Sequence, residues 1–227
     1  MTGQLPFETD VIATSAGNLE ITFLGHGSLL LTCGGKTFYV DPYSQVADYA
    51  QLPEADVILI THEHRDHLDT GAVAQVRRER TVVVLTEACA RQLAGGIVMR
   101  NGERRVVAGV PVEAVPAYNL VHTRDNGQPF HPKGMGNGYI LTFGEQRVYI
   151  AGDTEDIPEM RALTGIECAF LPMNLPYTMT PEMVAEAARA FRPRLLYPYH
   201  YGTTDTSQLE ALLRDEPGIE VRIRAMA

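Results

Sequence analysis

One short stretch of the chain carries four side chains of the kinds that bind transition metals. It begins directly after the apolar run 57–60 and contains His62, His64, Asp66 and His67. In an extended strand, residues two apart point to the same side, so His62 and His64 leave the strand end together. Asp66 and His67 follow on the next turn and can reach the same place. The spacing therefore predicts a metal site at the end of a buried strand.

The composition is that of an ordinary globular protein with an acidic excess. The 227 residues are 45% hydrophobic and 21% charged, and the formal net charge is −9. We predict one domain over residues 1–227, because no linker-like stretch divides the chain. The negative charge and the lack of a basic run disfavour a nucleic-acid partner. A small-molecule substrate is the expected partner, and a homo-oligomer is compatible with this composition.

Neither a membrane segment nor a disulfide framework is expected. No apolar stretch approaches the roughly 18 residues that a membrane helix needs, so no membrane insertion is predicted. The three cysteines, Cys33, Cys89 and Cys168, are odd in number and far apart, which favours free thiols. Residues 1–15 lack the basic and apolar regions of a leader peptide, so a cytoplasmic location is expected.

Strands and helices alternate along the first half of the chain. Apolar runs predict strands at 19–24, 28–33, 36–40, 57–61 and 81–85, with a hairpin turn at Gly34-Gly35. Helical spacing predicts helices over 70–80 and 87–94, the second ending at a pair of glycines. Short strands are expected near 97–99, 104–108 and 111–115.

The second half repeats this pattern. Residues 138–153 resemble residues 27–41, since each segment has an apolar strand, a polar turn, a second apolar strand and a final Asp. Helices are predicted over 181–191, with Thr180 as N-cap, and over 206–214, with Asp205 as N-cap. Strands follow them at 194–198 and 219–223. Two such halves predict an α/β fold, namely an αββα sandwich with two sheets face to face and helices outside.

Two further candidate ligands stand at strand ends in the second half. Asp153 follows a glycine after an apolar strand, and His200 follows the run 195–199. The loop over 117–137 shows no periodicity, and loops of that length in compact domains are commonly functional or disordered. It contains two histidines, His122 and His131, which are therefore candidates as well.

The motif at 61–68, the sequence at 152–154 and His200 resemble the signatures of the metallo-β-lactamase-fold superfamily of metal-dependent hydrolases. The resemblance begins near 25–27 and is greatest to the branch of ascorbate-6-phosphate lactonase-like proteins and phospholipase-D-type N-acylethanolamine enzymes. It implies an αββα sandwich with a two-metal site at the sheet edges. In that site one ion is held by His62 and His64 and the other by Asp66, His67 and His200, with Asp153 between them.

One ligand position stays open. The superfamily usually has a further His between the motif and the bridging Asp, and at that place this chain has Asn119. His122 and His131 lie nearby, and we favour His131 because it begins the turn-rich stretch that enters the second-half hairpin. If neither reaches the metal, the first site is weak and a single ion remains.

The resemblance implies hydrolysis by a metal-activated hydroxide of a small, anionic lactone, ester or phosphoester. Asp66 is the candidate to carry a proton, and His26 to orient the substrate or a carboxylate. Tyr177 is a candidate donor to an oxyanion, as are Tyr118, Tyr199 and Tyr201. Asp41 is expected to hydrogen-bond the ligand-bearing loops.

The ligand set also bears on the metal and on the substrate. All proposed ligands offer nitrogen or oxygen, so a divalent transition metal is expected as one or two ions, with zinc first and manganese second. Arg124 and Lys133 are the cations of the long loop and candidates to hold a substrate carboxylate or phosphate. The alternative is a non-catalytic metal-binding or ligand-sensing domain of the same fold, for which Asn119 is the main argument.

Overall fold

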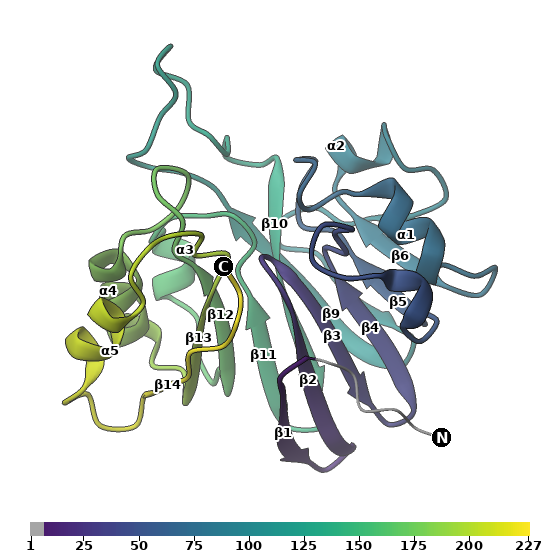
Figure 1. The fold of residues 1–227 in the computed structure, drawn as a ribbon, viewed down its shortest axis with the longest axis horizontal. Helices are drawn as coiled ribbons and strands as arrows, with labels where there is room; N and C mark the ends of the chain where they lie inside the picture. The colour runs from purple at the N-terminus through teal and green to yellow at the C-terminus, as the bar shows by residue number, and fades with distance from the viewer. Residues whose placement is uncertain (1–6) are drawn as a thin grey trace.

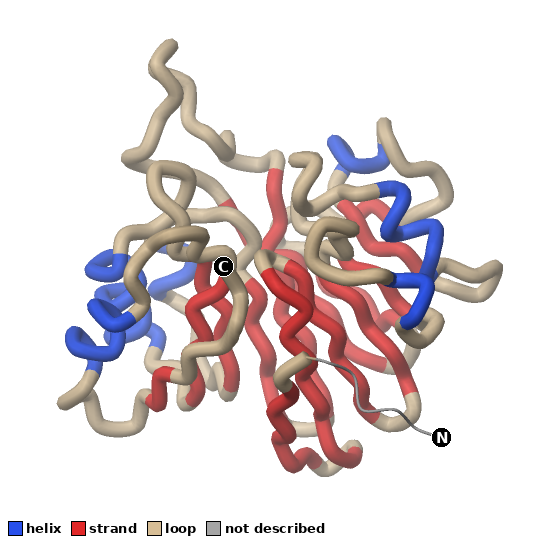
Figure 2. Tube along the Cα trace, in the orientation of Figure 1, coloured by secondary structure: helices blue, strands red, loops and turns tan. Residues whose placement is uncertain are grey.

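The computed structural model describes residues 7–227, and these form two seven-stranded β-sheets packed face to face. Residues 1–6, part of the predicted domain 1–227, lie outside the described residues. Helices cover the outer face of each sheet (Figures 1 and 2). This arrangement confirms the predicted αββα sandwich.

The first half of the chain builds the first sheet in chain order. Its strands are β1 (Thr9–Thr14), β2 (Gly17–Gly25), β3 (Ser28–Cys33), β4 (Lys36–Val40), β5 (Val57–Leu59), β6 (Val82–Leu85) and β7 (Ile97–Val98). The pairs from β1 to β4 are antiparallel, and the pairs from β4 to β7 are parallel.

The second half builds the second sheet by the same plan. Its strands are β8 (Arg104–Val107), β9 (Val110–Ala117), β10 (Gly136–Phe143), β11 (Gln146–Ile150), β12 (Cys168–Pro172), β13 (Leu195–Tyr199) and β14 (Glu220–Val221). Three antiparallel pairs are again followed by three parallel pairs. The hairpins β3–β4 and β10–β11 hold matching places in the two sheets, so the predicted sequence repeat has a counterpart in the topology.

The helices lie on the outside in two groups. They are η1 (Tyr49–Gln51), α1 (Thr70–Val76) and α2 (Glu87–Ala90) on the first sheet, and α3 (Pro158–Arg161), α4 (Pro181–Phe191) and α5 (Ser207–Leu213) on the second. Thr180 caps α4 by accepting from the Met183 N–H, as predicted. Within residues 7–227, no helix is both long and apolar enough to cross a membrane.

The main core lies between the sheets. Apolar side chains of both inner faces fill it, and Phe38 meets Phe143 edge to face across the interface at a centroid separation of 5.4 Å. Phe170 stacks on Tyr197 at 5.1 Å in the same layer. Burial of each such ring contributes about 1.5–3 kcal/mol, so this layer fixes how the two sheets, and the strand ends above them, lie against each other.

Some element boundaries differ from the sequence prediction. The helix predicted over 70–80 ends at Val76, because Arg77 has an extended backbone and Arg78 donates to Thr81 instead of continuing the helix. The helix predicted over 87–94 ends at Ala90 in turns. Strand β1 was not predicted. The predicted N-cap Asp205 is also wrong: Thr206 is the N-cap of α5, and Asp205 accepts from Ser207 one step outside it.

Candidate metal centre

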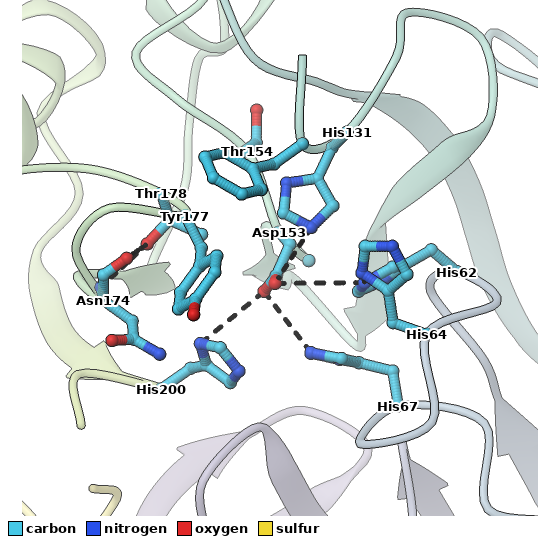
Figure 3. A network of polar contacts seen from close by, with 12 residues as sticks. His62, His64, His67, His131, Asp153, Thr154, Asn174, Tyr177, Thr178 and His200 are labelled. Atoms are coloured by element: carbon cyan, nitrogen blue, oxygen red, sulfur yellow. Dashed lines mark hydrogen bonds and ion pairs between the residues drawn. The ribbon is translucent and has the colours of Figure 1, made fainter. Parts of the chain in front are cut away.

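The predicted ligands gather where strands of both sheets end. His62 follows β5, Asp153 follows β11, and His200 follows β13, so all three project from the same edge of the sandwich. His131 comes from the long loop between β9 and β10. Figure 3 shows the imidazoles arranged around the carboxylate of Asp153.

Two groups of ligand atoms lie at this edge, and a third joins them. The first contains His62, His64 and His131, the second contains His26, Asp66, His67 and His200, and the third contains His62, His67 and Asp153. In each group the ligand atoms lie within 4.8 Å of one another. The division of the ligands between two ions stays a prediction of the resemblance, and the structure places His26 beside the second group.

Asp153 lies between the two groups. Its Oδ2 is 3.2 Å from His131 Nε2 and 3.9 Å from His62 Nε2. Its Oδ1 is 3.5 Å from His67 Nε2 and 3.8 Å from His200 Nδ1. One oxygen therefore faces each group, which is the geometry that a bridging carboxylate needs.

Hydrogen bonds behind the ligands select their tautomers. Asp41 is fully buried and accepts from the Thr61 hydroxyl at 2.6 Å and from His67 Nδ1 at 2.8 Å. Since the Thr61 hydroxyl proton is used there, its oxygen accepts from His62 Nδ1 at 3.0 Å. In its neutral form each of these imidazoles thereby carries its proton on Nδ1 and directs an unprotonated Nε2 at the cluster, as metal ligands require. Asp41 has the supporting role that the sequence predicted; that of Thr61 was missed, although it precedes His62 directly.

The long loop brings His131 to the cluster and not His122. Asn119 Oδ1 accepts from His131 Nδ1 at 2.7 Å and from its N–H at 2.8 Å, so His131 Nε2 faces Asp153. His122 Nδ1 instead lies 2.7 Å from the buried carboxylate of Glu155. Asn119 is therefore an orienting residue behind a ligand, a role that the sequence did not reveal.

Glu155 holds this part of the loop. Its carboxylate accepts from the N–H groups of Leu120, Val121 and His122 at 2.6–2.7 Å and from Asn119 Nδ2 at 2.9 Å. Although burial acts to raise it, these hydrogen bonds hold the pKa of Glu155 below its ordinary value. The sequence contains little indication of this role, because a single Glu two residues after Asp153 does not show that it binds N–H groups more than 30 positions earlier.

The electrostatics of the cluster favour a cation. Burial lowers the pKa of both His62 and His64, which keeps these ligands neutral. Although burial acts to raise it, His200 and His67 hold the pKa of Asp153 well below its ordinary value. Burial acts to lower the pKa of His67, yet Asp153 and Asp41 raise it well above its ordinary value. Positive charge is thus drawn to the space between these side chains.

Three buried atoms of the cluster have no hydrogen-bond partner. They are His67 Nε2, Asp153 Oδ1 and His200 Nδ1, and they face one another. Buried polar atoms are normally paired, and a group that accepts electron pairs from all three would pair them. A divalent transition metal meets this requirement, and the nitrogen and oxygen donors suit zinc or manganese.

Three residues at the centre have a left-handed backbone without being glycine. The φ angles are 52° for His26, 42° for Asp41 and 47° for His200. Such residues cost of order 1–3 kcal/mol each and are concentrated at functional sites. The Asp41 carboxylate and the bond from the His200 N–H to the His26 carbonyl, at 3.0 Å, help to hold this geometry.

A cavity of about 460 Å³ opens beside the cluster. Of the four candidate tyrosines, Tyr177 lines it. Tyr118 donates to Glu159, and the hydroxyls of Tyr199 and Tyr201 bond to the backbone, at Gly152 and Arg224 respectively. Lys133 pairs with Glu159 at 2.8 Å and is not among the residues that line the cavity, whereas Arg124 is.

Comparison with known proteins identifies the family. The model of the β-lactamase superfamily domain matches residues 20–200. The chain belongs to the β-lactamase superfamily. A UPF0173 metal-dependent hydrolase from Thermus thermophilus is 32% identical over 195 residues, which cover 82% of this chain and 84% of that protein.

Solved structures agree with this assignment. A crystal structure from Parabacteroides distasonis, classed as a metal-dependent hydrolase, is 50% identical with a TM-score of 0.93 and covers 97% of this chain and 100% of its own. The metallo-β-lactamase fold protein YhfI from Bacillus subtilis is 14% identical with a TM-score of 0.72 over 90% of this chain and 95% of that chain, and supports the fold alone. The sandwich described above is thus the metallo-β-lactamase fold.

Proposed function

We propose that this chain is a metal-dependent hydrolase that acts on a small, anionic lactone, ester or phosphoester. The observation that carries the proposal is the set of partnerless buried atoms between two ligand groups that share Asp153. The relatives from Thermus thermophilus and Parabacteroides distasonis are named as metal-dependent hydrolases, which supports the same activity. The substrate class follows the resemblance to the lactonase-like and N-acylethanolamine branch.

The two groups would hold one ion each. His62, His64 and His131 form the first site, and Asp66, His67 and His200 form the second, with Asp153 contributing to both. Zinc is the first candidate and manganese the second. When bound, such ions supply an activated water and polarise the substrate oxygen that gains charge.

The surrounding residues would position the substrate and carry the proton. Asp66 Oδ2 accepts from His26 Nε2 at 2.9 Å and from His200 Nε2 at 3.3 Å. Although burial acts to raise it, these two contacts hold the pKa of Asp66 far below its ordinary value, so the residue is a carboxylate. The proton that the attacking water gives up would be shared between Asp66 and His26, rather than held by Asp66 alone, before it passes to the leaving group.

Tyr177 completes the proposed site from the second sheet. Its side chain is 44% exposed, and Figure 3 shows its phenol directed toward the side of His200 and Asp153. Its side chain lines the cavity, so its hydroxyl would be available to donate to a developing oxyanion. The proposal further includes a cytoplasmic location and no nucleic-acid partner, and a homo-oligomer is compatible with it.

The test is metal content joined to activity. Purified protein should carry one to two equivalents of a transition metal by mass spectrometry. His64→Ala or Asp153→Ala should lower this metal content sharply. Loss of a residue behind the ligands weakens metal affinity roughly 10–100-fold, and loss of a ligand should weaken it at least as much. His122→Ala is the matched control, because its side chain faces Glu155 instead of the cluster.

Hydrolysis of a panel of lactones, esters and phosphodiesters completes the test. Protein without metal, whose activity neither Zn²⁺ nor Mn²⁺ restores, would refute the proposal. Protein that binds metal but hydrolyses nothing would instead favour the ligand-sensing alternative. The argument for that alternative is weaker in the structure, because Asn119 orients His131 and does not replace it.

A further inference from the structure

Two arginines line the cavity beside the metal ligands. Arg65 stands inside the ligand motif, between His64 and Asp66, and Arg124 comes from the long loop. The cavity of about 460 Å³ lies within the 300–1,000 Å³ range usual for small-molecule sites. Any molecule that places a bond at Asp153 therefore lies within one small space that both arginines line.

Neither arginine has an acidic partner. Within residues 7–227, no carboxylate forms an ion pair with Arg65 or Arg124, although the chain has a net charge of −9. Elsewhere, arginines of this protein find such partners readily: Arg189, for example, pairs with both Glu186 and Glu216. Four other arginines of the described residues, Arg77, Arg80, Arg91 and Arg214, also form no ion pair, so what distinguishes Arg65 and Arg124 is that both line the cavity.

Arg124 is also held in place. Its guanidinium lies over the ring of Phe130 at 5.1 Å from the centroid, and its Nη2 donates to the Phe130 carbonyl at 3.3 Å. Phe130 in turn contacts Tyr177 edge to face at 5.0 Å. The ring and the carbonyl of Phe130 thus hold the guanidinium in place without neutralising it, and a stacked guanidinium loses little freedom when it binds an anion.

We propose that Arg65 and Arg124 form an anion subsite that binds a carboxylate or phosphate group of the substrate, separate from the bond that is cut. The proposal rests on the proposed hydrolase function and narrows its substrate to molecules with such a group. A planar guanidinium presents two parallel N–H donors to either anion, so the geometry serves both. Lys133, the other cation of the loop, has no part in it because it pairs with Glu159.

The test uses sets of substrates that share one scissile bond and differ in a distal neutral, carboxylate or phosphate group. The wild type should favour the charged members by kcat/KM. Arg65→Gln and Arg124→Gln should each reduce that preference about tenfold, as expected for losing a hydrogen bond to a charged group. The charged substrate, carboxylate or phosphate, whose kcat/KM falls more in the arginine variants identifies the anion that the subsite binds.

Arg80→Gln is the matched control, because Arg80 is exposed and precedes β6 at the opposite end from the ligands. It removes the same charge and should leave the preference intact. An equal loss in Arg80→Gln would show that net charge alone sets the preference, and would overturn the subsite. So would a wild type without preference, or arginine variants that keep it.

A binding measurement separates this proposal from the proposed function. Calorimetric titration of the metal-loaded protein with phenyl phosphate and with benzoate requires no turnover. If the wild type hydrolyses no substrate, the hydrolase proposal fails, but the subsite is still supported if either arginine variant weakens binding of one anion about tenfold. Equal binding of both anions by wild type and variants would refute the subsite itself.

Discussion

Replacing Asn119 with Ala should weaken metal binding at the first site while leaving all its ligands in place. The Asn119 side chain makes four hydrogen bonds of 2.7–2.9 Å, two accepted from His131 and two donated, to Glu155 and to the Tyr177 carbonyl. Without the acceptor, the His131 ring is free to turn its Nε2 away from Asp153. Losses of this kind lower metal affinity about 10–100-fold.

The same change should destabilise the protein, because buried donors lose their acceptor. We expect a cost of about 2–4 kcal/mol, since each unsatisfied buried group costs about 1–3 kcal/mol. For a chain of this size the melting temperature should fall by about 5–15 °C. Competition with a coloured chelator measures the affinity, and thermal unfolding followed by circular dichroism measures the stability.

Asn119→Asp separates the two effects. It retains an acceptor for His131 but places a carboxylate against Glu155, so metal affinity should be kept while stability falls. His122→Ala serves as the control from the same loop. If Asn119→Ala binds metal as tightly as His122→Ala does, then Asn119 does not orient His131, and the reasoning is refuted.

Two further predictions concern single carboxylates. Asp66→Asn should lower kcat by about 10²–10⁴ while circular dichroism shows a retained fold, and near wild-type turnover would show that Asp66 is merely structural. Asp10→Asn should lower the melting temperature at pH 7 by about 5 °C, because Asp10 on β1 accepts from Tyr197, Arg222 and Arg224. Although burial acts to raise it, these bonds hold the pKa of Asp10 below its ordinary value. Its contribution is therefore present above about pH 3.9 and is lost as the pH falls further, so the two melting curves should converge in acid. A difference that persists unchanged at pH 2 would contradict this.

The sequence predicted what local pattern determines. The motif from His62 to His67 follows a buried strand, so its register alone brings the side chains together. The repeat of strand, turn, strand and Asp likewise predicted both hairpins and two sheets. Strand β1 was not predicted, because it is an edge strand with half its residues exposed, and its short segment does not alternate regularly between apolar and polar residues.

The choice between His122 and His131 could not be made from local pattern. It depends on Glu155, which binds three N–H groups of the loop from more than 30 residues away. The same holds for the cations near the site. Lys133 pairs with Glu159 in the folded chain and so has no part in the proposed anion subsite, whereas Arg65 does. Such contacts are set by tertiary packing, which no spacing within the loop records.

The division of the chain into two sheets has a consequence for the order of events during synthesis. Each ligand group contains residues from both halves of the chain. His62 and His64 are synthesised before His131, and Asp66 and His67 are synthesised before His200. A ribosome that has made only the first sheet presents an incomplete set of donors. If these groups bind metal as proposed, loading would be a late step, completed after β13 has been added, and selection among competing ions would be made by the folded protein and not by the growing chain.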